Sequence, residues 1–335
     1  MREVKKPLQI DGMKKPDREQ QEEHSCHSWL HIGSDAIIID MISMDAAGCI
    51  LVGLSSVEWG QADHPLKRDR MRLGCCGSMV SPSTDSIGIE TVEALTEIGF
   101  DYIELSLAHL AALPEQEFSQ LARRVERSGI RCEACNNFFP STIRLTGADA
   151  RLNAALEYAG LALNRAARLG ASVIVFGSAG AKNVPAGFSR VYAWSQIVEL
   201  LMHLGPIAAQ HDLTIVIEPI TKLESNLVNL AAEGLRLARE VHHPNIQLLV
   251  DFYHLTMEEE GPEIILEAGT VIRHLHLASP EGRRYPSEMT PACARFFQLM
   301  RDVKYSGRCS IEAFTHDFAA DARRAFRLLR SIDQE

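Results

Sequence analysis

Short apolar runs alternate with amphipathic segments along most of the chain. From Met71 onward the runs have strand length, and they are expected over 71–75, 100–105, 130–134, 172–176, 213–218, 245–251, 271–277 and 308–312. Helices are expected between them, over 88–98, 114–128, 148–169, 191–211, 230–241, 258–267, 291–303 and 317–332. Eight strand and helix pairs in about 265 residues have the size and rhythm of a (β/α)₈ TIM barrel. A doubly wound open sheet is the alternative, but it would not gather the ends of the last four strands around one point.

The last four of these runs each end in an acidic or imidazole side chain. A single acid at a strand end is more often a helix N-cap or a loop charge. Four in succession, about thirty residues apart, favour a shared site at the carboxyl ends of the strands, where barrels of this kind keep their chemistry. The four residues are Glu218, Asp251, His276 and Glu312.

These side chains would form an oxygen-rich site with one nitrogen ligand. Such a set suits a divalent ion such as Mn²⁺, Mg²⁺ or Co²⁺. Zinc bound by thiolates is disfavoured, because no cysteine occupies these positions. The Gly-rich segment 177–181 lacks the lysine and spacing of a nucleotide loop, so a mobile barrel loop is expected there.

Residues 1–70 lack the regular alternation of the rest of the chain and are expected to be an N-terminal extension that is partly disordered, with the barrel over 71–335. A strand or two within 36–54 would pack on the barrel. His24, Cys26, His27 and His31 lie close together, but they lack a second ligand pair at zinc-finger spacing, so no metal site is expected there. Expression of 71–335 alone would test whether the extension is dispensable.

Composition and charge narrow the function. Hydrophobic residues make up 46% of the chain, as in a globular protein with a large core, and the net charge of -10 argues against a nucleic-acid partner, although a local basic patch is compatible with it. The eight cysteines are irregularly spaced, which favours a reducing cytoplasm over a disulfide framework. Cys132 and Cys135 are expected to be packed thiols. No run of eighteen uncharged apolar residues exists, so no membrane span is expected.

Five segments together resemble the xylose-isomerase-like barrel superfamily, and within it the sugar epimerases of the tagatose and psicose 3-epimerase type. Order and separation both match, and the resemblance covers 71–335. The segments are Ile217-Glu218, Glu224–Asn229, Asp251–His254, His274–His276 and Ile311–Phe314.

The resemblance implies that Glu218, Asp251, His276 and Glu312 bind one divalent metal, most often Mn²⁺. It also implies a small-molecule sugar as substrate and, by analogy, a homodimer or homotetramer. The family's substrate contacts correspond to Glu224, His254 and Arg283. Arg284 is the alternative to Arg283, because the loop 276–284 departs from the family's usual form. The segments 75–78 and 218–221 also depart from it, and His254 has the alternative role of a partner that orients Asp251.

The implied chemistry is proton transfer at a carbon next to a carbonyl. A metal ion stabilises the resulting enediolate, while Glu218 and Glu312 act as base and acid on opposite faces of the carbon. Access from both faces gives epimerisation of a ketose, and access from one face gives aldose–ketose isomerisation. His254 would orient the substrate oxygen or move protons between oxygens, and Arg283 and Glu224 would hold hydroxyls.

Three other functions use the same barrel. A metal-dependent lyase or dehydratase acting on a keto-sugar or an oxidised glycoside would need the same ligands. An abasic-site endonuclease would need further histidines on the second and third strands, and 100–105 and 130–135 contain none. A binding module without catalysis would retain the metal but show no turnover.

Overall fold

The computed structural model describes residues 31–32, 35–36, 70–81 and 86–332. The chain divides into two units, Met1–Pro65 and Leu66–Glu335. In the first unit, β1 (His31–Ile32) pairs antiparallel with β2 (Asp35–Ala36). The remainder of the extension predicted for 1–70, including nearly all of the strands expected within 36–54, lies outside the described residues.

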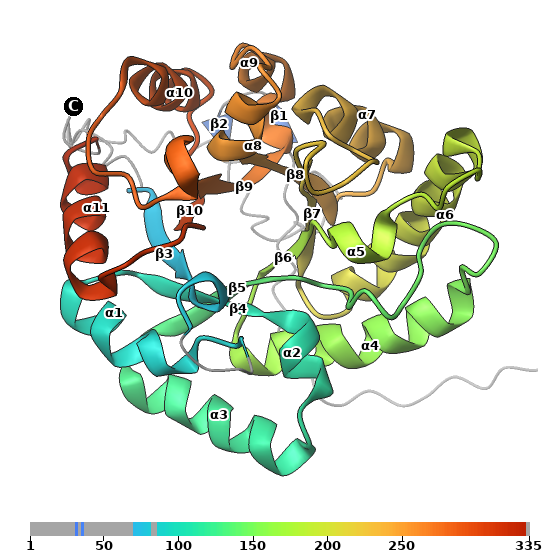
Figure 1. Ribbon diagram of the computed structural model, residues 1–335, viewed down its shortest axis with the longest axis horizontal. Helices are drawn as coiled ribbons and strands as arrows, with labels where there is room; N and C mark the ends of the chain where they lie inside the picture. The colour runs from blue at the N-terminus through green and yellow to red at the C-terminus, as the bar shows by residue number, and fades with distance from the viewer. Residues whose placement is uncertain (1–30, 33–34, 37–69, 82–85, 333–335) are drawn as a thin grey trace, which may run out of the picture. The chain divides into compact units, whose positions relative to one another are not determined.

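The second unit contains a closed barrel of parallel strands (Figure 1). Its strands follow the order β10-β3-β4-β5-β6-β7-β8-β9, so each strand lies beside its neighbour in sequence and the last lies beside the first. The predicted TIM barrel is therefore confirmed, and the doubly wound alternative is wrong. The strands are β3 (Arg72–Cys76), β4 (Tyr102–Ser106), β5 (Arg131–Asn136), β6 (Val173–Phe176), β7 (Thr214–Ile217), β8 (Ile246–Asp251), β9 (Ile272–Leu277) and β10 (Arg308–Ile311).

Helices surround the barrel (Figure 1). On α3, Phe118, Leu121 and Val125 are buried at a spacing of three and four residues, as an amphipathic helix on a sheet requires. Gly170 ends α4 with a φ of 86°, the left-handed cap that favours glycine. The main outer helices are α1 (Val92–Ile98), α3 (Glu115–Ser128), α4 (Leu152–Leu169), α6 (Arg190–Ala209), α7 (Ala231–Val241), α10 (Pro291–Asp302) and α11 (Phe318–Ile332).

The predicted helix over 258–267 is wrong in its position. The structure has α8 (Phe252–Met257) directly after β8 and then α9 (Ile264–Ala268). The Asp251 side chain accepts a hydrogen bond from the Tyr253 N–H, which caps α8 at the strand end. Gly261 and Pro262 lie in the break between the two helices.

Several short elements were not expected from the sequence. The predicted loop over 177–181 contains α5 (Ala179–Lys182), and α2 (Leu107–Ala112) follows β4. Four 3₁₀ turns complete the described structure: η1 (Gly77–Met79), η2 (Ile89–Thr91), η3 (Gly269–Val271) and η4 (Glu281–Arg283).

An ion cluster lies among the strands at their amino-terminal ends. Glu133 of β5 accepts hydrogen bonds from Arg72 of β3, over 2.9 Å, and from Arg308 of β10, over 2.7 Å. These charged side chains form ion pairs with one another. Catalytic residues of such barrels lie at the opposite, carboxyl ends of the strands.

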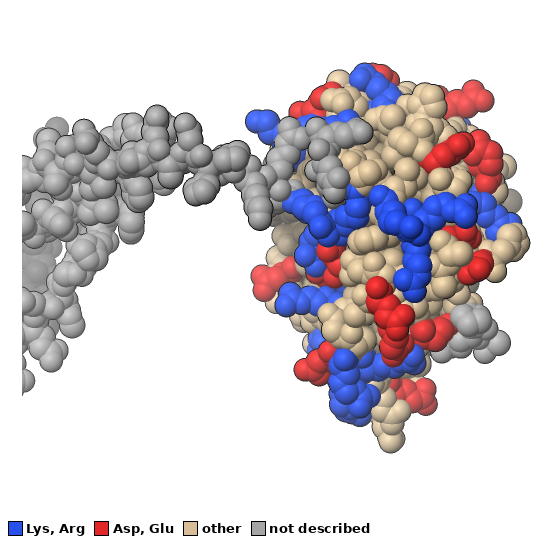
Figure 2. Space-filling model, turned by 90° about the vertical axis from the view of Figure 1, so that its left-hand side faces the viewer, with Lys and Arg blue, Asp and Glu red and all other residues tan. Residues whose placement is uncertain are grey.

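Both signs of charge are present on the outer surface. Figure 2 shows basic and acidic side chains interspersed on the face that lies to the left in Figure 1, the side of α11. Arg323, Arg324 and Arg327 of α11 line part of this surface and form a local basic patch. Within the described ranges, no helix is long and apolar enough to cross a membrane.

Candidate metal and active site

The four predicted metal ligands meet at the carboxyl ends of four neighbouring strands. Glu218 follows β7, Asp251 ends β8, His276 lies in β9 and Glu312 follows β10. The His276 Nδ1 atom lies 2.8 Å from the Glu218 Oε1 atom and 3.5 Å from the Glu312 Oε2 atom. Ligand atoms of Glu218, Asp251, His254 and Glu312 all lie within 4.8 Å of one another.

This donor set fits a divalent cation. The carboxylates are buried, and Asp251 Oδ2 has no hydrogen-bond partner in the described structure although it is shielded from solvent. An unpaired buried carboxylate oxygen is costly unless a cation or donor satisfies it. Three carboxylates and one imidazole are the ligands expected for Mn²⁺, Mg²⁺ or Co²⁺.

The surroundings push the pKa values of the site carboxyls apart. Burial raises the pKa of Glu218, and burial raises the pKa of Asp251 to about 6. Burial alone would also raise the pKa of Glu312, but the charges of Arg283 and His276 outweigh it and hold that pKa at about 2. Glu312 is therefore the more strongly ionised of the two glutamates, an asymmetry that suits an acid and base pair.

The Arg283 side chain contacts Glu224, Glu312 and Tyr253. Its guanidinium donates to Glu224 over 3.1 Å and forms a closer ion pair with Glu312. It also lies 4.9 Å from the ring centroid of Tyr253, within cation–π range. Of the two arginines proposed for this role, the structure brings Arg283 to the carboxylates, whereas the Arg284 backbone pairs with Ser279 and Phe314.

The hydrogen bonds of His254 define its tautomer. The Thr221 backbone N–H donates to Nδ1 over 3.2 Å, so Nδ1 is an acceptor and the proton of the neutral ring is on Nε2. Burial lowers the pKa of His254, which keeps the ring neutral. The Nε2 atom lies 3.6 Å from Asp251 Oδ2, so the N–H faces the carboxylates. His254 can therefore act as a neutral donor.

Lys182 of α5 fixes the strand end that carries Glu218. Its Nζ donates to the Gly177 carbonyl over 2.6 Å and lies 3.3 Å from the Glu218 carbonyl. Burial lowers the pKa of Lys182 to about 8. Gly177 has no side chain because a Cβ there would overlap the Glu218 carboxylate. The Gly-rich segment thus shapes the site, a role that its composition did not indicate.

Sequence reasoning missed two further polar residues at the barrel interior. Asn136, at the end of β5, donates to Glu312 Oε1 over 3.4 Å. Glu104 of β4 is fully buried and contacts His276 Nε2 over 3.0 Å. Tyr102 packs in the lumen. Because side chains alternate along a strand, Glu104, two residues later, is expected to point the same way. This alternation is the sequence signal that could have identified Glu104.

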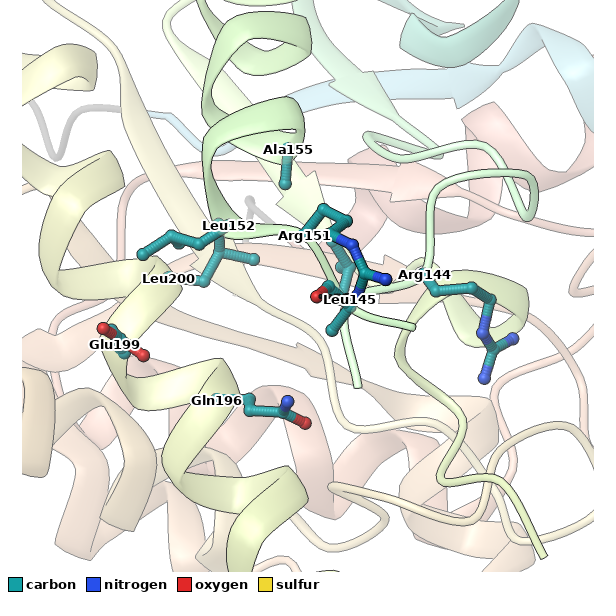
Figure 3. Close-up of a pocket in the computed structure, with 9 residues that line it drawn as sticks. Arg144, Leu145, Arg151, Leu152, Ala155, Gln196, Glu199 and Leu200 are labelled. Atoms are coloured by element: carbon teal, nitrogen blue, oxygen red, sulfur yellow. Dashed lines mark hydrogen bonds between the residues drawn. The ribbon is translucent and has the colours of Figure 1, made fainter. Parts of the chain in front are cut away.

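A separate cavity of about 170 Å³ lies beside α4 and α6 (Figure 3). Two of its arginines already bind backbone carbonyls: Arg144 donates to Gly180 over 2.7 Å and Arg151 to Ala148 over 2.9 Å. None of the four predicted metal ligands lines it. This cavity is therefore distinct from the candidate metal site at the strand ends.

The family comparison agrees with this architecture. The model of the xylose isomerase-like TIM barrel matches residues 92–332 of the 335-residue chain. The chain belongs to this family. The predicted resemblance to the xylose-isomerase-like superfamily is thereby confirmed.

Curated proteins with similar sequences include ketose 3-epimerases and a 2-oxo-tetronate isomerase. A D-psicose 3-epimerase of Agrobacterium fabrum is 25% identical over 230 residues, which cover 67% of this chain and 78% of the relative. A 2-oxo-tetronate isomerase of Pectobacterium atrosepticum is 27% identical over 239 residues, covering 67% of this chain and 85% of the relative.

Solved structures share the fold. A crystal structure of D-psicose 3-epimerase in the presence of D-fructose superposes with a TM-score of 0.70 at 20% identity, covering 79% of this chain and 100% of that one. A family 2 AP endonuclease from Brucella melitensis gives a TM-score of 0.63 at 18% identity, covering 74% and 94%. At these identities the likeness concerns the barrel alone.

Proposed function

We propose that this protein is a divalent-metal-dependent ketose epimerase that works through an enediolate, with Glu218 and Glu312 as acid and base. The relatives named as ketose 3-epimerases confirm the coarser prediction of an enzyme of the carbohydrate isomerase and epimerase class. The metal, the residue roles and the reaction are the proposal. The observation that carries it is the clustering of the Glu218, Asp251 and Glu312 carboxylates, two of which, Glu218 and Glu312, also lie within 3.5 Å of the His276 Nδ1 atom.

Glu218, Asp251, His276 and Glu312 would hold the cation, with Mn²⁺ the best match to this donor set. When bound, the cation supplies Lewis-acid stabilisation of charge on the substrate oxygens, worth several kcal/mol. Its two glutamate ligands extend from different strands, β7 and β10, and both approach His276 Nδ1. A substrate carbon between these carboxylates would be open to proton transfer from both faces.

The acid and base roles follow from the positions of the glutamates. One carboxylate removes the proton from the carbon beside the carbonyl, and the other returns a proton to the opposite face, which inverts that carbon. In the reverse direction the two glutamates exchange roles. If only one of them reaches the carbon, the same site moves the carbonyl and gives isomerisation.

The other polar residues would bind and orient the sugar. The neutral His254 presents its Nε2–H towards the site and would donate to a substrate oxygen. Arg283 and Glu224 form an ion pair of 3.1 Å at the edge of the site, where both can bind hydroxyls. The exposed Phe314, two residues after Glu312, offers an apolar surface to the carbon chain.

The test is proton exchange followed by NMR. Mn²⁺-loaded protein in D₂O is incubated with free ketoses, sugar phosphates and oxidised glycosides, beside Glu312→Gln and the control Glu117→Gln, whose side chain is exposed on α3. Deuterium next to a ketose carbonyl, lost in Glu312→Gln and kept in Glu117→Gln, supports the proposal. Release of an aglycone from oxidised glycosides without exchange on any ketose would assign a lyase instead.

A further inference from the structure

A buried polar cluster in the barrel lumen includes His276, one of the four strand-end groups. Its centre is Glu104 of β4, which interacts through both of its carboxylate oxygens. Oε1 lies 3.0 Å from His276 Nε2, while Oε2 lies 2.8 Å from His274 Nε2 and accepts from Ser310 Oγ over 2.6 Å. Tyr102 and Ser310 share a further hydrogen bond of 2.8 Å. All five side chains belong to residues with no exposed surface.

The cluster fixes the orientation of the His276 ring. An ionised carboxylate only accepts hydrogen bonds, so the contact with Glu104 places an N–H at Nε2 of His276. The other nitrogen, Nδ1, lies 2.8 Å from the Glu218 carboxylate and 3.5 Å from that of Glu312, so a cation bound between these carboxylates would take the place of a proton on Nδ1. Turning the ring over would place a C–H against Glu104 and remove a charge-assisted hydrogen bond.

We propose that Glu104 is the positioning residue of the cation site, holding His276 by its Nε2–H so that the Nδ1 lone pair is presented to the cation. This inference rests on the proposed metal-dependent function. A carboxylate behind a metal-binding imidazole fixes the tautomer and raises the basicity of the ligand. Ser310 of β10 and His274 of β9 in turn hold Glu104, and Tyr102 holds Ser310.

The same residues allow a different arrangement, in which Glu104 itself binds a cation. Cys76, Glu104 and His276 offer ligand atoms within 4.8 Å of one another. However, both oxygens of Glu104 are already engaged, and a cation there would replace the hydrogen bond to His276. The Cys76 Sγ atom lies 4.0 Å from His276 Nε2, too far for a strong hydrogen bond to that nitrogen. The geometry favours Glu104 as an acceptor.

The test compares Mn²⁺ affinity by calorimetry in the unmodified protein, in Glu104→Gln and in Glu133→Gln. Glu133 is another buried glutamate of the barrel, and its partners are Arg72 and Arg308. Glu104→Gln is expected to weaken Mn²⁺ binding by about 10–100-fold, and Glu133→Gln to leave it unchanged. Equal affinities in all three proteins would overturn the role of Glu104. Absence of Mn²⁺ binding by the unmodified protein would instead overturn the proposed function.

A second measurement does not depend on the folding of Glu104→Gln. In the Co²⁺-loaded protein, an imidazole N–H on a coordinated histidine gives a hyperfine-shifted proton signal, and the buried hydrogen bond to Glu104 predicts slow exchange of that proton with solvent. Ser310→Ala, which removes one donor to Glu104, should speed the exchange while His276 still binds Co²⁺. A coordinated His276 without an Nε2 proton would show that Nε2 is a metal ligand and would contradict the positioning role.

Discussion

The backbone N–H of Thr221 donates a hydrogen bond to Nδ1 of His254 over 3.2 Å. The Thr221 Oγ1 atom in turn donates to Glu258 over 2.8 Å, and the Lys222 N–H donates to the same carboxylate. These bonds hold the loop after β7 against α8 and set which nitrogen of His254 carries the proton. The bond to His254 comes from the backbone, whereas the bond to Glu258 depends on the Thr221 side chain.

His254 is therefore expected to act as a donor and not as a base. His254→Ala should lower kcat/KM by about 10²–10³-fold, the loss typical of one stabilising donor, and His254→Gln, which keeps an N–H donor, should retain more activity than the alanine variant. Steady-state kinetics with a ketose that the protein converts measures kcat/KM for both variants. Equal losses in the two variants would contradict a hydrogen-bonding role.

The pH dependence follows from the same geometry. Because burial lowers the pKa of His254, the ring stays neutral at pH 7 and gains a proton only as the pH falls below the usual histidine range. The ring of His254 should therefore titrate below about pH 6.5. Histidine NMR signals followed against pH measure this directly, and a titration midpoint above that value would contradict it.

Cation removal should lower both activity and stability. Chelation would remove the divalent charge from three buried carboxylates that Arg283 and His276 neutralise only in part. Added Mn²⁺ at about 100 times its Kd should stabilise the fold by about 2.7 kcal/mol. Thermal unfolding with and without Mn²⁺ measures the shift in Tm. Asp251→Asn serves as the control variant, and its Tm should respond less to Mn²⁺. An equal response would remove Asp251 from the ligand set.

Arg283 and Arg284 offer a matched pair of substitutions. Arg283→Ala removes the cation that holds the pKa of Glu312 at about 2, so that pKa should rise and KM should increase. Arg284→Ala should leave KM unchanged, because no contact of the Arg284 side chain with a site carboxylate is present in the described structure. The two KM values decide between these residues, and a larger effect at Arg284 would reverse the assignment.

Two glycines test the packing of the lumen. A Cβ on Gly74 would overlap the Tyr102 ring, so Gly74→Ala should destabilise the fold by about 1–3 kcal/mol. Gly160 of α4 has open space around it, and Gly160→Ala should stabilise the helix by about 0.5–1 kcal/mol. Denaturant unfolding of both variants gives the comparison. Similar changes in the free energy of unfolding would show that the lumen is not tightly packed at Gly74.

The sequence predicted the barrel, and the four strand ends that it singled out lie on neighbouring strands. The apolar runs before Glu218, Asp251 and Glu312 have strand length, and adjacent parallel strands bring their carboxyl ends to one edge. The resemblance then implied Glu224, His254 and Arg283, which the structure places beside them. Their roles remain predictions for the experiments proposed for this site.

The features that the sequence did not predict depend on contacts between segments far apart in the chain. The proposed role of Glu104 depends on its contact with His276, 172 residues away, and Lys182 reaches the Glu218 carbonyl, 36 residues away. The position of α8 was missed because the Asp251 side chain both caps the helix and belongs to the site. Local propensity gives little signal for a side chain with two roles.

The most direct test of the central claim is the position of deuterium during turnover in D₂O. With the Mn²⁺-loaded protein and a ketose that it converts, transfer by two glutamates predicts that the product epimer carries deuterium at the inverted carbon from the first turnovers, while unreacted ketose keeps its proton. Product formed without deuterium at that carbon would contradict proton transfer by Glu218 and Glu312 on opposite faces.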